Sequence, residues 1–543
     1  MTDGGKRLER PDEKRDCDVA IIGAGPSGLV AASLLGKSGH RVVVVERYLE
    51  LYGLPRLSHI DGETARIVQS CGDVEAALRD AVAIDKYDYR DADGNVLIQL
   101  DWSGQQCGFP AHISIFQPDI ESAIYQSAQS EPNVTFLRGY DATTLTQNDE
   151  GVTVTAKPWS KDNCGGQPVI INAKFLIGAD GANSFVRREL GIGRFEYGFN
   201  ERWLNLDSEY LRDLGGRFDI LTNYCDPARG HMFMPIGKSR VRFEVRLLPG
   251  ESTDHWENIE NGWAWLAKQH ALGPDDIKPI RNIVYTFDPG IAESWQQGRI
   301  FLVGDAAHTM MPYMGQGACS GMRDGANIAW KLDLVLRGKS DASLLGTYEE
   351  ERRPHVTQIT EMALFLGQVA NEDDPEKVAI RNAMFLAREV PPMPPFPKVE
   401  TGVVRLEADG RLAPTTGAPA PQGTVRHNGT EGRLDDLTGG GFVLVCHTSP
   451  TSFLDPNNAE FLAELGCNIV VFGDAAYVDV GGDQTVFMES HDMAAYLRRP
   501  DFSLFGSVAR MEMLDDLVCD LREKLHWRAD HQNTDERVRE AAQ

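Results

Sequence analysis

Short apolar runs alternate with segments of helical spacing through the first half of the chain. Residues 19–22 form an apolar run that leads through a glycine turn into a helical pattern at residues 29–35. A second apolar run follows at residues 41–45. This strand–helix–strand order predicts an α/β fold of the Rossmann type, with a parallel sheet covered by helices. The polar residues 1–16 have no such pattern, and we expect them to form a disordered arm.

The buried-strand pattern returns twice further along the chain, and each time the strand ends at an acidic residue. Residues 175–179 lead into Asp180, and residues 300–303 lead into Asp305. Open α/β sheets bind their ligands at the carboxyl ends of the strands, so both carboxylates are expected near a ligand. Helical spacing also predicts three helices. One begins at Pro118, and the other two span residues 319–336 and 343–364.

Residues 190–285 change to an alternation of apolar and polar positions, which predicts an antiparallel sheet. The stretch HMFMPIGKSRVRFEVRLLPG is typical of two strands joined by a turn at residues 235–237. We expect this sheet, with parts of residues 80–118, to form a domain inserted into the first one. The first domain then comprises residues 17–189 and 286–387.

A proline-rich segment separates the last part of the chain from the rest. Five prolines occur within REVPPMPPFPK, so residues 388–414 are expected to be a linker. Residues 415–530 then show strand, strand and helix patterns of a separate α/β module. The charged tail after Trp527 is expected to fray.

Charge excludes two classes of partner. The 543 residues carry a formal net charge of −26, and 42% of them are hydrophobic. Binding to nucleic acid or to an anionic membrane surface needs a basic surface, so neither partner is expected.

Cysteine usage indicates the compartment. The nine cysteines include no CxxC pair and no Cys/His set with zinc-ligand spacing, so we expect no metal site. An odd number of widely spaced cysteines fits a reducing, cytoplasmic location. The sequence shows no signal-peptide pattern and no apolar run of the ~20 residues that a membrane helix needs.

The first glycine turn has the features of a dinucleotide site. Gly23, Gly25 and Gly28 form GxGxxG between the first strand and its helix, and Glu46 ends the second strand 23 residues after Gly23. The glycines allow a tight turn, close approach of the backbone to a pyrophosphate and close packing of helix on strand. The helix N-terminus favours the phosphates, and Glu46 can accept hydrogen bonds from ribose hydroxyls.

The stretch GDAAHTMMPYMGQGACSGMRDG is a second segment whose pattern predicts contact with a ligand. Asp305 can hold a ribose or ribityl hydroxyl, and Pro312 restricts the loop. Gly315 and Gly317 allow the chain to lie flat against a planar ligand. The helix expected from residue 319 directs its positive end at that ligand, which suits a reduced, anionic flavin.

The GxGxxG turn with Glu46, the GADG segment at Asp180 and the GDAAH…P…GQG loop together resemble the class A flavoprotein monooxygenases, the single-component aromatic hydroxylases. The loop and the segment YEEERRPH are most similar to the branch of 3-(3-hydroxyphenyl)propionate, phenol and polyketide hydroxylases. The resemblance covers about residues 17–364. It implies a p-hydroxybenzoate hydroxylase-like fold, with an FAD-binding domain, an inserted substrate-binding sheet and a thioredoxin-like C-terminal domain.

The resemblance also implies which residues contact FAD. The first motif would bind the ADP half with Ser27 at the pyrophosphate, while Arg56 and Gln117 would contact the cofactor further along. Asp180 would serve FAD and the nicotinamide nucleotide, and Pro312 would lie at the flavin face where oxygen reacts. The full expected set is Gly23, Gly25, Ser27, Gly28, Glu46, Arg47, Arg56, Gln117, Asp180, Asp305, Pro312, Gly315, Gln316 and Gly317.

Hydroxylation of a small phenolic substrate is the reaction that the resemblance implies. NADH or NADPH reduces FAD, O2 adds to give a flavin C4a-hydroperoxide, and its distal oxygen attacks the ring. The protein must exclude water and help the phenol to lose its proton. Besides Pro312, the candidates are His59, His112, Tyr224 and Arg242, where Arg242 either pairs with a substrate carboxylate or lies outward on the surface.

Other outcomes stay open at this point. The same cofactor would support epoxidation or Baeyer–Villiger oxidation of a polyketide, and a non-catalytic flavin-binding sensor is a more remote alternative. Trp263-Ala264-Trp265 echoes a flavin halogenase motif, although it lies in an expected amphipathic helix. The substrate, the choice between NADH and NADPH, and a monomeric or homodimeric state are undecided.

Overall fold

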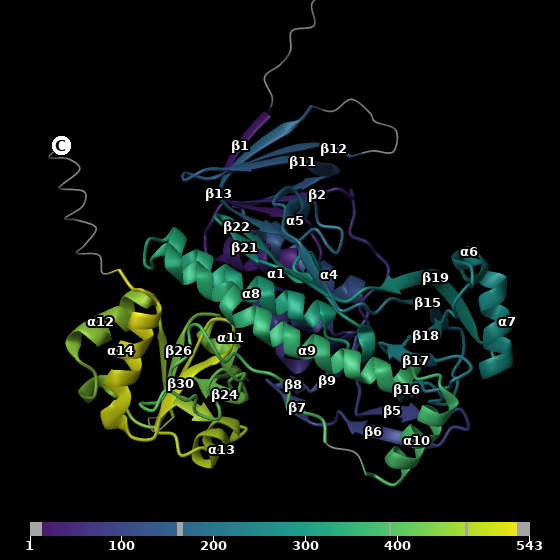
Figure 1. The fold of residues 1–543 in the computed structure, drawn as a ribbon. Coiled ribbons are helices and arrows are strands. Elements are labelled where there is room, and N and C mark those ends of the chain that lie inside the picture. The colour runs from purple at the N-terminus through teal and green to yellow at the C-terminus, as the bar shows by residue number, and fades with distance from the viewer. Residues whose placement is uncertain (1–12, 160–166, 390–391, 473–475, 529–543) are drawn as a thin grey trace, which may run out of the picture.

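The computed structural model describes residues 13–159, 167–389, 392–472 and 476–528. An eight-stranded sheet forms the upper part of the larger body as drawn in Figure 1. Five of its strands run parallel in the order β10-β2-β1-β13-β22, as a Rossmann-type fold requires. The strands of this sheet are β1 (Glu13–Ile22), β2 (Val42–Glu46), β10 (Val134–Arg138), β11 (Tyr140–Gln147), β12 (Val152–Pro158), β13 (Val169–Gly178), β21 (Gln296–Gln297) and β22 (Ile300–Leu302).

The first strand is longer than its apolar run. It starts at Glu13 because Glu13–Cys17 pairs with the extended N-terminal half of β13. The expected disordered arm is therefore wrong for residues 13–16, and residues 1–12 lie outside the described residues.

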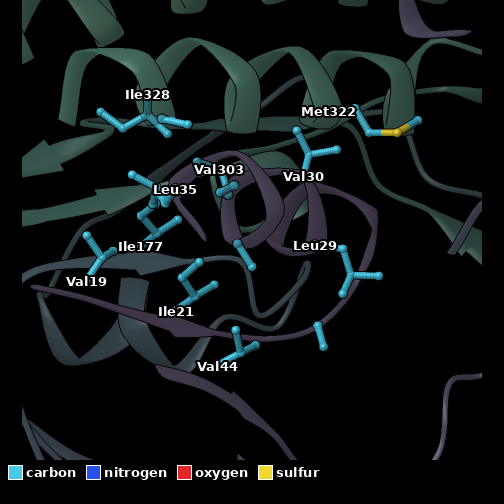
Figure 2. Packing of buried hydrophobic residues seen from close by; sticks show 14 of the residues in the cluster. Val19, Ile21, Leu29, Val30, Leu35, Val44, Ile177, Val303, Met322 and Ile328 are labelled. Carbon is cyan, nitrogen blue, oxygen red and sulfur yellow. The ribbon is translucent and has the colours of Figure 1, made fainter. Parts of the chain in front are cut away.

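Four long helices pack around this sheet. Helix α1 (Pro26–Lys37) contacts both the sheet and α8 (Gly317–Leu336), and the side chains between them are apolar (Figure 2). Helix α4 (Gln117–Ser130) packs on α1, and α9 (Thr347–Asn371) packs on α8. Helix α9 starts after a 3₁₀ turn and extends past the expected end at residue 364.

A seven-stranded sheet forms the second layer, in the order β19-β15-β18-β17-β16-β5-β6. Its edge pair comes from β5 and β6, which precede the other five strands in the chain by about a hundred residues. Pro235 and Ile236 lie within β17, so the expected turn at residues 235–237 is displaced to Gly237 and the two residues after it. The strands are β5 (Lys86–Arg90), β6 (Val96–Asp101), β15 (Glu201–Tyr210), β16 (Leu221–Tyr224), β17 (His231–Ile236), β18 (Arg240–Arg246) and β19 (Ile277–Phe287).

The two faces of this second sheet have different neighbours. One face packs against α7 (Ile259–His270), with Leu206, Phe233 and Phe243 buried beneath it. The other face packs against the 3₁₀ turn η2 (Pro312–Met314), with Trp203 and Met232 in that contact. We call these the outer face and the inner face. The inner face therefore meets the loop that was expected to carry a ligand.

The C-terminal module is a mixed α/β unit. Its main sheet has the order β27-β26-β29-β30, in which only β26 and β27 are parallel. Helices α12 and α14 share a core with one face of the sheet, and α13 shares a core with the other. The elements are β24 (Thr424–His427), β25 (Thr430–Arg433), α11 (Leu434–Thr438), β26 (Val443–Cys446), α12 (Pro456–Leu465), β27 (Asn468–Val471), β28 (Tyr477–Asp479), α13 (Asp483–Ser490), β29 (Ala495–Arg498), β30 (Leu504–Val508) and α14 (Leu514–Lys524). The thioredoxin-like character of residues 415–530 and the predicted domain limits stay predictions.

Buried charged pairs join this module to the first body. The Arg66 Nε lies 2.5 Å from Asp435 Oδ2, and the Arg66 side chain has no exposed surface. Arg499 Nη2 donates to Glu351 of α9 at 2.6 Å. Breaking one partner of such a pair leaves a buried charge uncompensated, so these contacts fix the module in one position.

Smaller elements complete the molecule. They are β3 (His59–Asp61), α2 (Gly62–Cys71), α3 (Val74–Ala77), β4 (Val82–Ala83), β7 (Gln105–Gln106), β8 (Phe109–Pro110), β9 (His112–Ser114), α5 (Phe185–Glu189), β14 (Arg194–Glu196), α6 (Thr253–Glu257), β20 (Gly290–Ala292), β23 (His308–Thr309) and α10 (Pro375–Leu386). Within the described ranges, no helix has both the length and the apolarity to cross a membrane. The same residues hold no cluster of three metal-ligating side chains.

Candidate functional site

The first glycine turn has a backbone that only glycine tolerates. Gly23 has φ +102°, and a Cβ there would collide with the carbonyl of Ala179 at the end of β13. A Cβ at Gly28 would collide with the Gly23 carbonyl, which lets α1 start close to the strand. A Cβ at Gly25, in contrast, would meet nothing within 4 Å. Gly25, at the N-terminus of α1, therefore borders open space on the side where phosphates would bind.

Ser27 brings the first and third motifs into contact. A Cβ at Gly304 or at Gly321 would collide with the Ser27 Oγ, and one at Gly325 would collide with the Ser27 carbonyl. The small residues of α8 thus let it pack closely on the N-terminus of α1. Sequence reasoning missed Gly304, Gly321 and Gly325; for the two glycines in α8, the spacing of four residues between Gly321 and Gly325 was the available signal.

Glu46 lies at the glycine turn as expected. Its Oε2 accepts a hydrogen bond from the Ala24 N–H at 2.8 Å, and its Oε1 accepts one from the Tyr48 N–H at 2.9 Å. Arg47 is half-exposed and forms an ion pair with Asp141 at 3.3 Å. The Arg47 guanidinium is therefore engaged by the protein, whereas Glu46 lies against the turn.

The two strand-end carboxylates differ in their surroundings. Asp180 accepts hydrogen bonds from the Ser184 Oγ at 2.5 Å and the Val186 N–H at 3.0 Å, so it stabilises the start of α5. Burial raises the pKa of Asp180 above its usual value. The Asp305 side chain is exposed and lies within electrostatic range of Arg56. Among the described residues it has no hydrogen-bond partner, so it is available to a ligand hydroxyl.

Asp324 in α8 holds the Asp305 loop in place. Its Oδ2 accepts hydrogen bonds from the Gly304 N–H at 3.1 Å and from His308 Nε2 at 2.7 Å. Its Oδ1 accepts one from Arg352 Nε at 2.9 Å. Burial alone would raise the pKa of Asp324, but His308 and Arg352 lower it below its usual range. Sequence reasoning missed this residue because its partners are far apart in the chain.

A second buried charge network fixes the glycine-spaced loop. Arg323 donates to Asp61 Oδ2 at 2.5 Å, to Glu63 Oε2 at 2.7 Å and to Gln316 Oε1 at 3.1 Å. Gln316 in turn donates from Nε2 to Asp61 at 3.0 Å. Burial opposes ionisation of Asp61, but the Arg323 charge holds its pKa well below the usual range. Gln316 is thus held by protein groups just before Gly317, where α8 begins.

Two histidines support the same loop from β3 and β9. His59 Nδ1 lies 3.3 Å from the Gly315 carbonyl oxygen, and His59 Nε2 lies 3.0 Å from His112 Nδ1. The rings of His112 and Trp102 stack with centroids 4.0 Å apart. Burial lowers the pKa of His59, and burial together with His59 lowers the pKa of His112 to about 3. Both rings are therefore neutral at neutral pH.

Neutral rings leave one consistent arrangement of protons. A carbonyl oxygen only accepts, so His59 donates from Nδ1 to Gly315 and accepts at Nε2 from the His112 N–H. Neither nitrogen of His59 is then free for a phenol. A Cβ at Gly315, which has φ +63°, would contact the His59 ring. His59 accordingly shapes the Pro312–Gly317 loop, a role that the sequence did not indicate.

Gln117 holds the segment that carries Arg56. Its Oε1 accepts hydrogen bonds from the backbone N–H groups of Arg56 at 2.8 Å and Leu57 at 2.6 Å. Its Nε2 donates to Glu121 at 2.7 Å. The exposed Arg56 guanidinium lies 3.9 Å from the Tyr52 ring centroid. Both ends of the Gln117 amide are therefore engaged by protein groups, while Arg56 stays accessible.

Arg242 is buried rather than outward. It donates to both carboxylate oxygens of Asp207, at 2.6 and 3.1 Å. It also donates to the backbone carbonyls of Arg56 at 2.9 Å and Pro55 at 3.0 Å. The expected surface position is wrong, because the inner face of the sheet packs against this segment. The guanidinium is also engaged by Asp207, which leaves it no free edge for a substrate carboxylate.

Tyr224 lies on the other side of the second sheet. Its ring stacks on His231 with centroids 4.5 Å apart, and both pack with the cluster under α7. Trp263 and Trp265 belong to the same outer cluster, as helix residues that pack on a sheet. Because side chains alternate between the faces of a strand, Tyr224 points away from Pro312. The structure therefore corrects the expectation that Tyr224 lies beside the substrate.

The geometry fits an elongated dinucleotide with a planar end group. Open space at Gly25, the helix N-terminus of α1 and Glu46 suit the nucleotide half. Asp305 and the loop from Pro312 to Gly317 lie at the far end, joined to the first turn through Ser27. The glycine turn, Glu46, Asp305 and the Pro312 loop are thus parts of one connected region, and their contacts with a cofactor stay predictions.

Comparisons with known proteins place the chain in a family. Residues 16–363 match the family described as FAD binding domain, and residues 417–524 match the HcaD C-terminal domain. A probable NADH-specific resorcinol 4-hydroxylase of Rhodococcus jostii is 34% identical over 506 residues, covering 91% of this chain and 92% of that one. A 3-(3-hydroxy-phenyl)propionate/3-hydroxycinnamic acid hydroxylase of Comamonas testosteroni is 29% identical, with 85% and 87% covered.

Solved structures share the fold. The flavin-dependent monooxygenase PieE, in complex with FAD and substrate, superposes with a TM-score of 0.77 at 21% identity, covering 94% of this chain and 99% of that one. Aklavinone-11 hydroxylase, with FAD and aklavinone, gives a TM-score of 0.73 at 24% identity and the same coverage. The family match covers the glycine turn, both strand-end acids and the Pro312 loop. The chain therefore belongs to the FAD-binding family of flavin-dependent aromatic hydroxylases.

Proposed function

We propose that this protein hydroxylates a small phenolic ring, with bound FAD, NADH as reductant and dioxygen as oxidant. The observation that carries the proposal is the contact of Ser27 with Gly304 and Gly321, which joins the nucleotide turn to the Pro312 loop. The relative that is 34% identical is named as an NADH-specific resorcinol 4-hydroxylase, which supports NADH and a phenolic substrate.

The residues that would hold FAD follow from the site. Gly23, Gly25 and Gly28 would admit the pyrophosphate at the N-terminus of α1, with Glu46 beside the ribose. Asp305, exposed at its strand end, would accept hydrogen bonds from hydroxyls of the ribityl chain. When bound, FAD supplies the redox chemistry and the activation of dioxygen.

The chain itself supplies position, exclusion of water and charge. The Pro312 loop is held by His59 and by Gln316, so it would present a fixed backbone to the cofactor ring. The N-terminus of α8 directs its partial positive charge at that loop and favours an anionic ligand. The inner face of the second sheet covers the loop, with Met311 and Tyr313 buried in the contact, and would keep water from the reacting atoms.

Substrate-dependent product formation tests the proposal. The purified holoprotein is incubated with NADH or NADPH and with resorcinol, phenol or 3-(3-hydroxyphenyl)propionate. We expect faster NADH oxidation and oxygen uptake with a phenol, and a product with one added oxygen atom by mass spectrometry. NADH oxidation that yields only hydrogen peroxide, or a ring-expanded or epoxidised product, would contradict phenol hydroxylation.

A cofactor-binding variant provides an independent test. Asp305→Ala should reduce the FAD retained on purification, because it removes the exposed carboxylate at the strand end. Asp275→Ala, an exposed acid in the turn before β19, is the matched control and should retain FAD as the parent does. Equal FAD content in both variants would remove Asp305 from the proposed site.

We further propose a cytoplasmic protein, and a homodimer as its assembly. The eight cysteines of the described ranges are free thiols, which suits a reducing compartment. Light scattering of the holoprotein at several concentrations tests the assembly, and a mass of one chain throughout would exclude the dimer.

A further inference from the structure

A row of aligned side chains crosses the inner face of the second sheet. Asn205 of β15 pairs with Glu244 of β18, and Glu244 pairs with Met232 of β17. Met232 then pairs with Asn223 of β16, and Asn223 pairs with Tyr89 of β5. Cross-strand partners have neighbouring side chains on one face, so these five residues form one continuous row.

This row faces the Pro312 loop. Met232 packs in the same cluster as Met311 and Tyr313, which flank Pro312. The alternate residues Phe233 and Phe243 point to α7 on the outer face instead. The row therefore lies opposite the loop that would hold the cofactor ring.

The polar ends of the row lack partners. Both amide atoms of Asn223, the Oδ1 of Asn205 and the hydroxyl of Tyr89 are buried without a hydrogen bond of normal geometry among the described residues. Asn223 and Tyr89 have no exposed surface, and Asn205 is 3% exposed. The Tyr87 hydroxyl interacts with both Asn223 and Tyr89, but it makes a hydrogen bond of normal geometry to neither. Buried polar groups are normally bonded, so four unpaired atoms on one face indicate a bound polar ligand.

Glu244, between the two asparagines, accepts no hydrogen bond from the described residues. It is 4% exposed, and its one recorded contact among the described residues is an ion pair with Arg242 at 3.7 Å. Arg242 is committed to Asp207 at 2.6 Å, so it compensates Glu244 only in part. Burial raises the pKa of Glu244 to about 7, opposed by Arg242 and reinforced by Asp207.

The two arginines that flank Glu244 on β18 are not free to bind an anion. Arg242 is paired with Asp207, and Arg246 is paired with Glu201 at 3.3 Å. Arg246 also donates to the Asn371 carbonyl at 3.1 Å. The row therefore offers hydrogen-bonding groups and one acidic side chain, and the two arginines beside Glu244 are committed to other groups.

We propose that Asn205, Asn223 and Glu244 select a neutral ring with at least two hydroxyl groups, and that they disfavour phenols with a carboxylate. The proposal rests on the proposed function, since it names the substrate class of the same site. One substrate hydroxyl donates to Glu244, which takes its proton as the O–H bond breaks and the electron pair stays on the phenolic oxygen. A second hydroxyl bonds to the amide of Asn223.

Two pairs of probes test the two parts of the proposal. Calorimetric titration of the holoprotein without NADH compares resorcinol with phenol, and 3-hydroxybenzamide with 3-hydroxybenzoate. We expect resorcinol to bind at least ~10-fold more tightly than phenol, because a site built for a hydroxyl leaves polar groups unpaired without it. We expect the amide to bind at least ~10-fold more tightly than the benzoate of similar shape, because of the Glu244 charge.

Variants assign each ratio to a residue. Asn223→Leu should bring the ratio of the affinities for resorcinol and phenol close to one. Glu244→Gln should do the same for the ratio of the affinities for 3-hydroxybenzamide and 3-hydroxybenzoate. Thr222→Val is the matched control, because Thr222 lies on the same strand and faces the other way, and it should keep both ratios.

The outcomes separate this inference from the proposed function. A parent protein with either ratio near one, or variants that leave both ratios unchanged, would overturn the assignment of the row. If both affinity ratios are as expected but no hydroxylated product forms, the proposed function is overturned and the assignment of the binding site is kept. If a variant fails to fold, the ratios of the parent protein still decide.

Discussion

Glu244 makes a prediction about stability that is independent of any substrate. The side chain is buried in the second sheet, where Arg242 compensates its charge incompletely and Asp207 opposes it. The change Glu244→Gln removes the charge and keeps nearly the same shape. Since a neutral amide does not incur the cost of a buried charge, we expect this variant to be more stable than the parent at pH 8.

The magnitude follows from the pKa of this carboxyl. Burial raises it from 4.5 to about 7 in the folded protein. Between these values the folded state keeps a proton that the unfolded state has lost, so parent stability falls as pH rises through this window. At ~1.4 kcal/mol for each pH unit, ionised Glu244 costs the folded state about 3 kcal/mol at pH 8. At pH 5 the cost shrinks to about 1 kcal/mol or less.

Urea unfolding followed by tryptophan fluorescence measures this difference. The parent and Glu244→Gln are compared at pH 5 and pH 8, both loaded with FAD and without substrate. The exposed Glu260→Gln in α7 is the control for a charge change and should match the parent at both pH values. A Glu244→Gln variant with an equal advantage at both pH values, or with lower stability at pH 8, would refute the reasoning.

Three further changes test the framework around the site. Gly23→Ala should abolish FAD retention, because φ +102° and the facing carbonyl leave no room for a Cβ; retained flavin absorbance would contradict it. Arg323→Met should destabilise the protein by about 3–5 kcal/mol in urea unfolding, because it leaves Asp61 buried without its partner. Arg66→Met should remove the charged contact between α2 and Asp435, which then keeps only Arg498 of its own module, and should expose the linker to limited proteolysis; an unchanged digestion pattern would argue against a fixed module.

Local sequence patterns determined the cofactor half of this protein. The glycines at 23, 25 and 28 and the acid at 46 are set by what a tight turn and a helix N-terminus require, and these constraints act within one strand–helix–strand unit. The structure places Glu46 at the turn and Asp305 exposed at its strand end, as their positions after apolar runs indicate. The strand and helix limits shifted by a few residues, because pairing partners such as β13 extend them.

The substrate half depended on contacts between distant segments. Alternation showed that Tyr224 and Arg242 lie in strands, but a period of two does not say which face turns to the cofactor. The packing of α7 on one face assigned Tyr224 to the outside and left Asn205, Glu244 and Asn223 opposite Pro312. Strand register across five segments of the chain made that row.

Charge pairing was equally beyond the sequence alone. Arg242 is engaged because Asp207, 35 residues away, meets it across a strand pair. His59 and His112 become neutral only because the fold buries them together. Composition and motifs thus determined that the chain binds FAD, since that rests on local backbone geometry. Tertiary structure decided which side chains face the Pro312 loop, since burial and pairing are properties of residues brought together from afar.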